Sequence, residues 1–515
     1  MGGEQFEQKE GSPELLQSLR SKATELLFRE EWEESIQLYT KFIDLSRTKI
    51  TKLAGSDPDS IHKLKKSLCL ALCNRAEARA RLHDSSEAMR DCDQALEIEN
   101  THFKTLLCKG KALLGLSKYS SALECFKTAL LDPQASESVT EYMEKCKKLE
   151  FKAKTGAFDL SDWILSGFRG ITPELAEFIG SVEIKKSEGS GRGLFATKNI
   201  VVGTLILVTR AVATERGILG SEESGEKAQM IMWKNFVEEV TKSVRRCDRT
   251  RRLVSSLSTG EEEEKLEIPD ISLFRPEEAS ETYDDSKQDL NKEYYGIGLW
   301  TLASFINHSC VPNARRVHVG DYAVVHASRD IKAGEEITSA YFDVLSSPLE
   351  KRKEMAESWG FSCKCSRCKF ESLLSVANQE IREFEMGLER GVDAGNAVYT
   401  VEEGMKRWKV KGKDKGLLRA SYWGVYEEVY NSERLMRRWG RKVPTMEVVV
   451  DSVCDVIGSD ERLLKMLVEG MKQKKNGGCS SSSIAEMEKV LKLGKGVYSK
   501  VVSKKKAMKT LVGLE

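Results

Sequence analysis

The chain has 515 residues, enough for roughly two to four domains, and its 81 basic and 80 acidic residues leave a formal net charge of +1. Because basic and acidic residues are nearly equal in number, the chain has no overall electrostatic attraction to nucleic acid or membranes. Direct nucleic-acid binding is therefore not expected. The 13 cysteines follow no apolar leader, which indicates a reducing compartment. No apolar run is long enough to span a membrane, so we expect a soluble protein of the nucleus, the cytoplasm or both.

Residues 16 to about 150 show helical spacing and an internal repeat. Small and apolar residues recur 34 residues apart, and a third copy with the same internal spacing precedes them. The positions are Ala23, Trp32, Ser35, Tyr39 and Phe42, then Ala76, Ala88, Cys92 and Ala95, then Gly110, Ala122, Phe126 and Ala129. A period of about 34 residues is typical of tetratricopeptide repeats, in which small side chains lie where two helices touch. The sequence therefore predicts a tetratricopeptide-repeat helical domain over residues 1–150.

Such an array offers a peptide-binding groove in most of its uses, although it can also be a structural brace. One subclass grips the terminal carboxylate of a chaperone tail with basic and amide side chains. The corresponding positions here hold Arg20, Thr24, Asn74, Lys104 and Cys108. Arg20, Asn74 and Lys104 suit a carboxylate, whereas Thr24 and Cys108 do not. An ordinary solvated groove is the favoured interpretation, and a bound peptide or chaperone tail is the alternative.

After a connector at residues 151–180, the pattern changes to short strands. Residues 182–208 alternate apolar and polar side chains, and β-branched runs return at 322–326 and 336–341. Between these strands, a helix is expected at 215–243. Five arginines from Arg245 to Arg252 and four glutamates at 261–264 then indicate a charged surface insertion, with a nucleic-acid patch as the weaker alternative. Helical spacing follows at 372–388, 417–439, 446–457 and 484–502.

Four short motifs carry the side chains with distinctive chemistry. They are S-G-R-G-L-F-A-T-K-N-I at 190–200, S-F-I-N-H-S-C-V-P-N at 304–313, A-G-E-E-I-T-S-A-Y-F-D at 333–343 and W-G-F-S-C-K-C-S-R-C at 359–368. Glycines allow a backbone to approach a ligand closely, and an Asn-His pair offers directional hydrogen bonds. These residue types suit a site where the backbone comes close to a bound ligand.

The last motif places Cys363, Cys365 and Cys368 within six residues, where one loop can surround three sides of a tetrahedral metal. The natural fourth ligand is Cys310 in the second motif. Four thiolates leave no open position for water, so a zinc ion here would be structural. Unrelated cysteines or a redox pair are the alternatives.

In their order and residues, these motifs resemble those of the SET-domain protein lysine methyltransferases, in particular the branch with a zinc-binding post-SET tail. The resemblance covers about residues 181–370. It implies an α+β multidomain fold, with a β-rich SET core at 181–345 that carries a charged insertion at about 215–293, a post-SET segment at 346–370 and a C-terminal helical domain at 371–515. The last part resembles the SET-and-MYND group, but the MYND zinc module is missing, because 214–293 contains only Cys247.

The resemblance also assigns roles to individual residues. The residues that would contact S-adenosylmethionine are Gly191, Arg192, Gly193, Ser304, Ile306, Asn307, His308 and Phe361. Tyr341 matches the catalytic tyrosine of the family. Trp359 stands where the SET-and-MYND group is expected to carry a tyrosine in its substrate channel, which leaves open how many methyl groups are added.

The sequence thus predicts an S-adenosylmethionine-dependent enzyme that methylates lysine in a histone or another protein, with one structural zinc ion. The helical array would select the substrate or bind a partner. A scaffold with an inactive SET core is the alternative, and Asn307, His308 and Tyr341 argue against it. The sequence does not choose between histone and other substrates.

Overall fold

The computed structural model describes residues 12–53, 57–82, 84–133, 137–168, 173–218, 222–258, 267–275, 294–377, 380–381, 383–384, 391–476 and 484–514. The chain divides into two compact units. The first comprises Met1–Thr155, Gly217–Arg252 and Phe274–Tyr295, and the second comprises Gly156–Arg216, Leu253–Leu273 and Gly296–Glu515. The finer domain limits expected from the sequence stay predictions.

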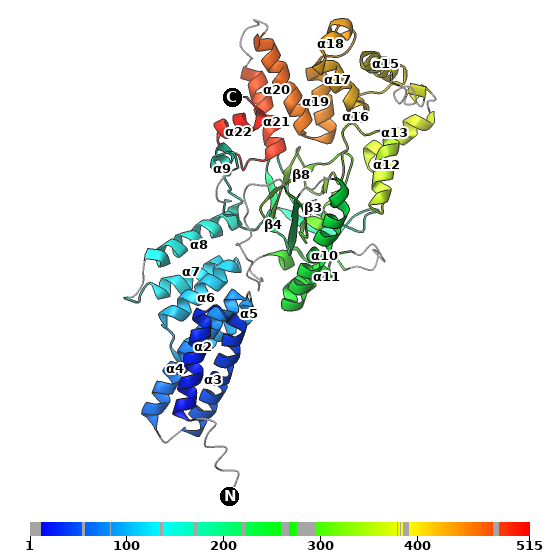
Figure 1. Ribbon diagram of the computed structural model, residues 1–515. Helices are drawn as coiled ribbons and strands as arrows, with labels where there is room; N and C mark the ends of the chain where they lie inside the picture. Colours follow the sequence, from blue (N-terminus) through cyan, green and yellow to red (C-terminus); the bar gives the residue numbers. More distant parts are fainter. Residues whose placement is uncertain are drawn as a thin grey trace. The chain divides into compact units, whose positions relative to one another are not determined.

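Antiparallel helix pairs form the N-terminal part of the first unit (Figure 1). The helices are α2 (Pro13–Phe28), α3 (Trp32–Lys52), α4 (Pro58–Arg81), α5 (Ser85–Ile98), α6 (Phe103–Gly115), α7 (Tyr119–Ala129) and α8 (Glu137–Thr155). The repeating small residues lie where the helices touch: Ala23, Ala76 and Ala88 are fully buried, and a Cβ on Gly110 would lie 2.6 Å from the Phe126 ring. The predicted tetratricopeptide-like array is confirmed.

The charged insertion contains more regular structure than the sequence indicated. It folds into α10 (Glu222–Arg246), α11 (Asp248–Ser255) and the 3-10 turn η2 (Ile271–Phe274). The predicted helix begins later than expected, because Thr214–Ile218 form strand β5. The four glutamates at 261–264 lie outside the described residues.

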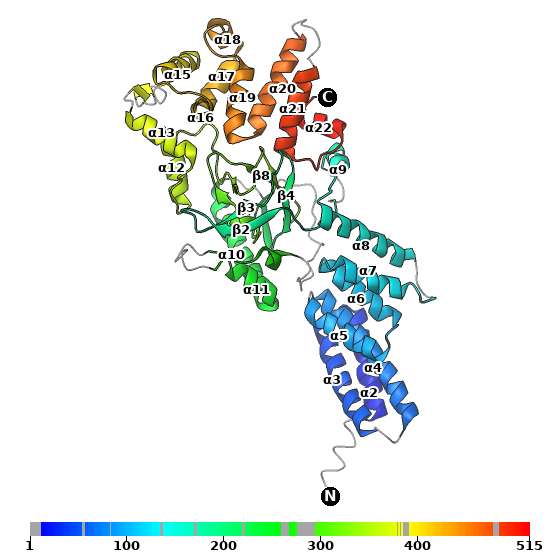
Figure 2. The same cartoon turned by 180° about the vertical axis from the view of Figure 1, so that it is seen from behind.

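Two four-stranded sheets form the core of the second unit (Figure 2). One has the order β1-β4-β9-β8 and the other β2-β3-β10-β7, while β5 pairs with β6. The remaining bounds are β1 (Phe178–Ile179), β2 (Val182–Lys186), β3 (Arg192–Ala196), β4 (Leu205–Arg210), β6 (Tyr294–Gly298), β7 (Asn307–His308), β8 (Ala314–Val319), β9 (Tyr322–Ala327) and β10 (Glu336–Ser339). The strand expected to reach Tyr341 therefore ends at Ser339, and the tyrosine lies on the segment that leaves it.

Helices follow and flank this β-core. They are α9 (Ser161–Leu165), η4 (Ala303–Phe305), α12 (Leu349–Ser358), α13 (Ser366–Ala377), α15 (Ala394–Arg407), α16 (Lys413–Ser421), α17 (Trp423–Asn431), α18 (Glu433–Trp439), α19 (Met446–Ile457), α20 (Glu461–Asn476), α21 (Ile484–Tyr498) and α22 (Lys505–Val512). The single helix expected at 417–439 is wrong, because the backbone of Ser432 is extended and its side chain caps α18 by accepting from Leu435 N. The helix expected from Ser372 starts six residues earlier, at Ser366.

The C-terminal helices are joined to the strands by specific polar contacts. His326 of β9 is fully buried, and its Nε2 donates to the carbonyls of Gly496 and Val497 on α21, at 3.2 and 3.1 Å. Arg315 of β8 donates to the carbonyl of Ser459 at 2.8 Å, just before α20. In both views, α19, α20 and α21 lie at one end of the sheets (Figures 1 and 2). No helix among the described residues is long and apolar enough to cross a membrane.

Candidate active site

The glycine turn and the two following motifs meet where β7 pairs in parallel with β10, with Asn307 opposite Thr338. The Asn307 amide nitrogen donates to the main-chain oxygen of Arg192 at 2.9 Å and to the Glu336 carboxylate at 2.7 Å. These two bonds use both amide hydrogens, so the side-chain oxygen is the atom that can accept from an amino or amide group of a ligand. One side chain thus holds three sequence motifs together.

The glycine turn has two separate structural requirements. Gly191 adopts φ +66°, a left-handed conformation that favours glycine. Gly193 is needed for space, because a Cβ there would lie 2.3 Å from a Glu336 carboxylate oxygen and 3.1 Å from the Asn307 amide. At Gly193 the structure therefore shows a close approach to Glu336 and Asn307, and the expected approach to a ligand stays a prediction.

Glu336 belongs to the cluster around Asn307, although the motifs did not single it out. One carboxylate oxygen accepts from Asn307, and the other accepts from the Ser187 hydroxyl at 3.0 Å. The pairing of β7 with β10 explains this position: Glu336 starts a strand whose alternate residue, Thr338, lies opposite Asn307, and alternate residues of a strand share a face. We identify Glu336 as the brace that fixes the Asn307 amide.

His308 and Tyr341 are connected through the main chain. The Tyr341 backbone N–H donates to His308 Nδ1 at 3.1 Å, and the Tyr341 hydroxyl donates to the carbonyl of Ile306 at 2.8 Å. His308 Nε2 lies 3.4 Å from the sulfur of Cys310. The predicted catalytic tyrosine and the predicted cofactor residues therefore form one contiguous cluster.

Aromatic rings surround this cluster. The His308 ring stacks on Phe342, with centroids 4.4 Å apart, and lies 5.3 Å from Phe361. The Tyr341 ring lies 5.1 Å from Trp359 and 6.0 Å from Phe361. Trp359 is 59% exposed, so it is available to a large substrate. The last motif thus brings two rings to the predicted methyl-transfer position.

The hydroxyl of Tyr341 is held in its protonated form. Burial raises the pKa of Tyr341 above its ordinary value of 10.0, although the positive charge of Arg316 works in the opposite direction. At neutral pH the group is therefore a phenol that donates to Ile306 O and keeps its oxygen lone pairs available.

Arg192 and Ile306 meet the cluster through their main-chain oxygens, whereas the Ser304 hydroxyl donates to a group outside it. The side chain of Arg192 donates to Glu267 O at 2.9 Å and lies over the Phe305 ring, while its main-chain oxygen meets Asn307. Ser304 is exposed, and its hydroxyl donates to Trp300 O at 3.0 Å. The carbonyl of Ile306 is engaged by Tyr341.

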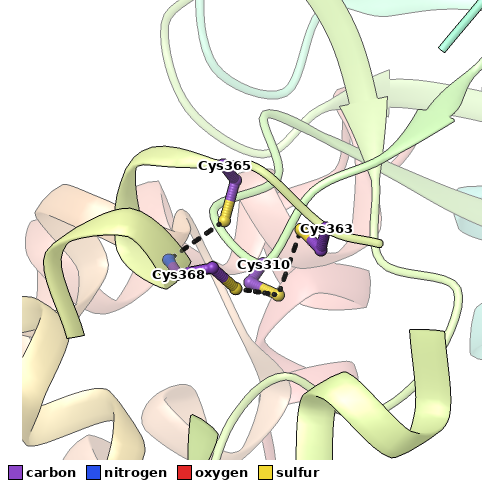
Figure 3. A group of neighbouring side chains, drawn as sticks. All are labelled: Cys310, Cys363, Cys365 and Cys368. Atoms are coloured by element: carbon purple, nitrogen blue, oxygen red, sulfur yellow. Dashed lines mark hydrogen bonds between the residues drawn. The ribbon is translucent and has the colours of Figure 1, made fainter. Parts of the chain in front are cut away.

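The four predicted metal ligands converge, as Figure 3 shows. The sulfurs of Cys310, Cys363, Cys365 and Cys368 all lie within 4.8 Å of one another, and Cys310 is 3.8 Å from Cys363 and 3.6 Å from Cys368. Zn–S bonds of about 2.3 Å in a tetrahedron require sulfurs about 3.8 Å apart. The donor set and its spacing therefore fit one tetrahedral zinc ion.

A buried ionic network lies beside this cluster. Arg352, which is 1% exposed, donates to the sulfur of Cys368 at 3.5 Å and pairs with Glu371. Arg367 is fully buried and reaches the same carboxylate at 2.8 Å. Two arginines and one glutamate leave one positive charge next to the cysteines, which stabilises thiolates over thiols. None of the sequence motifs predicted this network.

A cleft of about 1050 Å³ lies elsewhere in the second unit, between loops of the β-core and the C-terminal helices. The cleft is lined by Val311 and Ser366, each of which directly follows a cysteine of the cluster in the sequence. Residues of α16, α19 and α21 also line it. No predicted cofactor or catalytic residue lines it.

Comparison with known proteins agrees with the geometry. The SET domain family matches residues 191–342, the segment that contains Gly193, Asn307 and Tyr341. The chain therefore contains a SET domain, as predicted.

The relatives of this chain include methyltransferases. A protein of Gibberella zeae described as "Methyltransferase" is 24% identical over 379 residues, covering 66% of this chain and 49% of the relative. Human histone-lysine N-methyltransferase SMYD3 is 33% identical over 118 residues, covering 22% of this chain and 25% of the relative. The potential protein lysine methyltransferase SET6 of Saccharomyces cerevisiae is 42% identical over 82 residues, or 16% and 22% of the two chains. The chain thus spans half of the first relative's length and about a quarter of the others'.

Solved structures similar to this chain include tetratricopeptide domains. The Arabidopsis OM64 TPR domain is 24% identical and covers 26% of this chain and 96% of its own, with a TM-score of 0.21. The first TPR of Spaghetti (RPAP3), bound to an HSP90 peptide, is 21% identical and covers 27% and 96%, with a TM-score of 0.22.

Proposed function

We propose that this protein is an S-adenosylmethionine-dependent protein lysine N-methyltransferase. The observation that carries the proposal is the single cluster in which Asn307 bridges the glycine turn to Glu336 while His308 positions Tyr341. SET-domain lysine methyltransferases among the relatives support the same reaction class.

When bound, S-adenosylmethionine supplies a methyl group on a positively charged sulfonium, so the protein needs no strong acid. It needs a neutral lysine amine, whose ordinary pKa is about 10.4. The Trp359, Phe361 and Tyr341 rings would form apolar walls around the amine, and a bound substrate that covers them would exclude water and favour the neutral amine. Tyr341 orients the amine through its hydroxyl oxygen, and alignment of the reacting atoms supplies much of the rate.

Two groups of residues would hold the cofactor and the metal. Gly193, Asn307 and His308 form the cofactor wall, and Phe361 covers it. Cys310, Cys363, Cys365 and Cys368 would bind a structural zinc ion that fixes the segment carrying Phe361 and Trp359 beside the wall.

We also propose that the helical array binds the substrate protein or a partner. A clamp for a chaperone tail is the alternative, and three of the five positions that it would use also make hydrogen bonds within the fold. Asn74 donates to the Tyr39 hydroxyl at 2.8 Å, Thr24 lies 2.8 Å from the same hydroxyl, and Arg20 donates to Ser67 at 3.1 Å.

The test is methyl transfer from labelled S-adenosylmethionine to a protein extract by the full-length chain, followed by acid hydrolysis and amino-acid analysis. We expect labelled methyl-lysine with the wild type and none with Asn307→Ala. A folded wild-type protein that binds S-adenosylmethionine but yields no labelled amino acid would favour the alternative, a scaffold with an inactive SET core.

A further inference from the structure

Three potential metal ligands of different chemistry converge in the first unit, which does not contain the four-cysteine cluster. The sulfur of Cys69, a carboxylate oxygen of Glu99 and a ring nitrogen of His102 all lie within 4.8 Å of one another. We infer that these residues form a second metal site, which binds a divalent cation of the zinc class.

The fold brings the ligands together from separate helices of the array. Cys69 lies on α4 and is 1% exposed, and its thiol points to the end of α5, where it donates to the carbonyl of Ala95 at 3.4 Å. Glu99 caps the C-terminus of α5, and His102 caps the N-terminus of α6. The backbone N–H of His102 donates to the backbone carbonyl of Glu99 at 3.1 Å. This bond closes the turn and holds both side chains near the thiol.

The orientation of the His102 ring is fixed by a buried partner. Its Nδ1 lies 2.7 Å from the hydroxyl of Thr105, which is fully buried. Metal-binding histidines are commonly oriented by such a hydrogen bond from outside the ligand set. This contact distinguishes the site from a chance encounter of three mobile side chains.

The donor set selects the class of ion. One thiolate, one imidazole and one carboxylate suit zinc, whereas calcium and magnesium prefer oxygen ligands alone. Zinc would require sulfur and nitrogen to lie about 3.6 Å apart, and the structure holds the three ligand atoms within 4.8 Å of one another. Glu99 is exposed, so its carboxylate can reach the ion by side-chain rotation. Three protein ligands leave a fourth position for water.

Other cysteines of the array provide matched controls. Among the described residues, Cys73, Cys92 and Cys108 belong to no group of three potential ligands. Cys73 is buried one turn along the same helix as Cys69 and is therefore comparable in surroundings.

The experiment counts zinc by elemental analysis in full-length, reduced protein after equilibration with zinc and removal of the free ion. We expect His102→Gln and Glu99→Gln each to lose one equivalent per chain relative to the wild type, and Cys73→Ser to keep the wild-type count. Since Glu99 is exposed, its substitution tests the site even if changes at Cys69 disturb folding.

Cobalt replacement provides a second, independent measurement. The absorption spectrum of cobalt-loaded Glu99→Gln is subtracted from that of the cobalt-loaded wild type. The difference should be the spectrum of cobalt bound by a single thiolate, which is distinct from that of cobalt bound by four thiolates. The inference is overturned if Glu99→Gln and His102→Gln keep the wild-type zinc count, or if Cys363→Ser removes all bound zinc. Neither readout depends on methyl transfer, so the result is separate from that of the proposed enzyme activity.

Discussion

At the residue scale, the carboxylate of Glu336 holds the proposed cofactor wall together. It accepts hydrogen bonds from both Asn307 and Ser187, and it occupies the space that a side chain at position 193 would need. A hydrogen bond to a charged group contributes about 1.5–3 kcal/mol. Removal of this group should therefore disturb binding without removing any group that touches the substrate.

We expect Glu336→Ala to weaken S-adenosylmethionine binding by roughly 10- to 100-fold, because the Asn307 amide loses its brace. Calorimetric titration measures this change. Glu183→Ala is the control, since Glu183 lies on β2 of the same sheet and pairs only with Lys185 among the ion pairs of the described residues. Equal affinities for the wild type and Glu336→Ala would show that the brace has no role.

Tyr341 is the second test at this scale. Tyr341→Phe keeps the ring that packs near Trp359 and Phe361 and removes the hydroxyl that donates to Ile306 O. We expect turnover to fall roughly 100-fold or more, with cofactor affinity nearly unchanged, since the lost interaction acts on the reacting amine. Full turnover in steady-state assays of this variant would refute the role of the hydroxyl.

The sequence could predict much of the site at this scale, but only where a residue belongs to a motif. Asn307, His308 and Tyr341 were located by motif, and the structure places them together. Glu336 lies in the same motif as Tyr341, but its role depends on the parallel pairing of β7 and β10, which follows from tertiary structure and leaves no local pattern.

At the element scale, the four-cysteine cluster attaches the segment from Trp359 to Cys368 to the loop that precedes β8. Three of its ligands were predictable from their spacing, and the fourth from its place in another motif. The start of α13 at Ser366 was not predictable in this way, because Cys368 belongs both to the cluster and to the first turn of that helix.

We expect removal of zinc by a chelator, or Cys310→Ser, to weaken S-adenosylmethionine binding by more than roughly 10-fold, because Phe361 and Trp359 lose their attachment. Far-ultraviolet circular dichroism should change little, since the helices of both units remain. Cys454→Ser is the control, because Cys454 lies on α19 and does not belong to the cluster. Unchanged cofactor affinity in metal-free protein would contradict the structural role of the cluster.

At the scale of the whole molecule, the SET strands and the C-terminal helices belong to one compact unit. His326 illustrates the coupling: burial lowers its pKa to about 4, despite hydrogen bonds to Gly496 and Val497 that work in the opposite direction. Its Nδ1 is buried and has no hydrogen-bond partner among the residues that the structure describes. Protonation would therefore place an unsatisfied charge between β9 and α21.

The lowered pKa of His326 makes the unfolding free energy depend on pH. The unfolded chain takes up a proton at His326 near pH 6.5, whereas the folded chain does so only near pH 4, so stability is lost as the pH falls through this window. The loss amounts to at most about 3 kcal/mol. We expect His326→Gln to flatten the dependence of the unfolding free energy on pH between 6.5 and 4, measured by urea denaturation. The exposed His62, changed to Gln, is the control, and an unaltered pH profile for His326→Gln would rule out this source.

The sequence was least informative about the helical part of this unit. Helices α15, α20 and α22 were missed, and α16, α17 and α18 were merged into one. No proline marks the breaks at Tyr422 and Ser432, and the hydrophobic period continues through them, so the pattern does not predict them. Tertiary packing decides these boundaries.

The most direct test of the central claim is calorimetric titration of S-adenosylmethionine into the full-length, zinc-loaded protein. We predict one bound molecule per chain for the wild type, and loss of binding for Gly193→Ala, whose Cβ would lie 2.3 Å from Glu336. Gly424→Ala is the control, because the nearest atom to its added Cβ is 3.9 Å away. A folded wild-type protein that binds no S-adenosylmethionine would contradict the claim that these motifs form a methyl-transfer site.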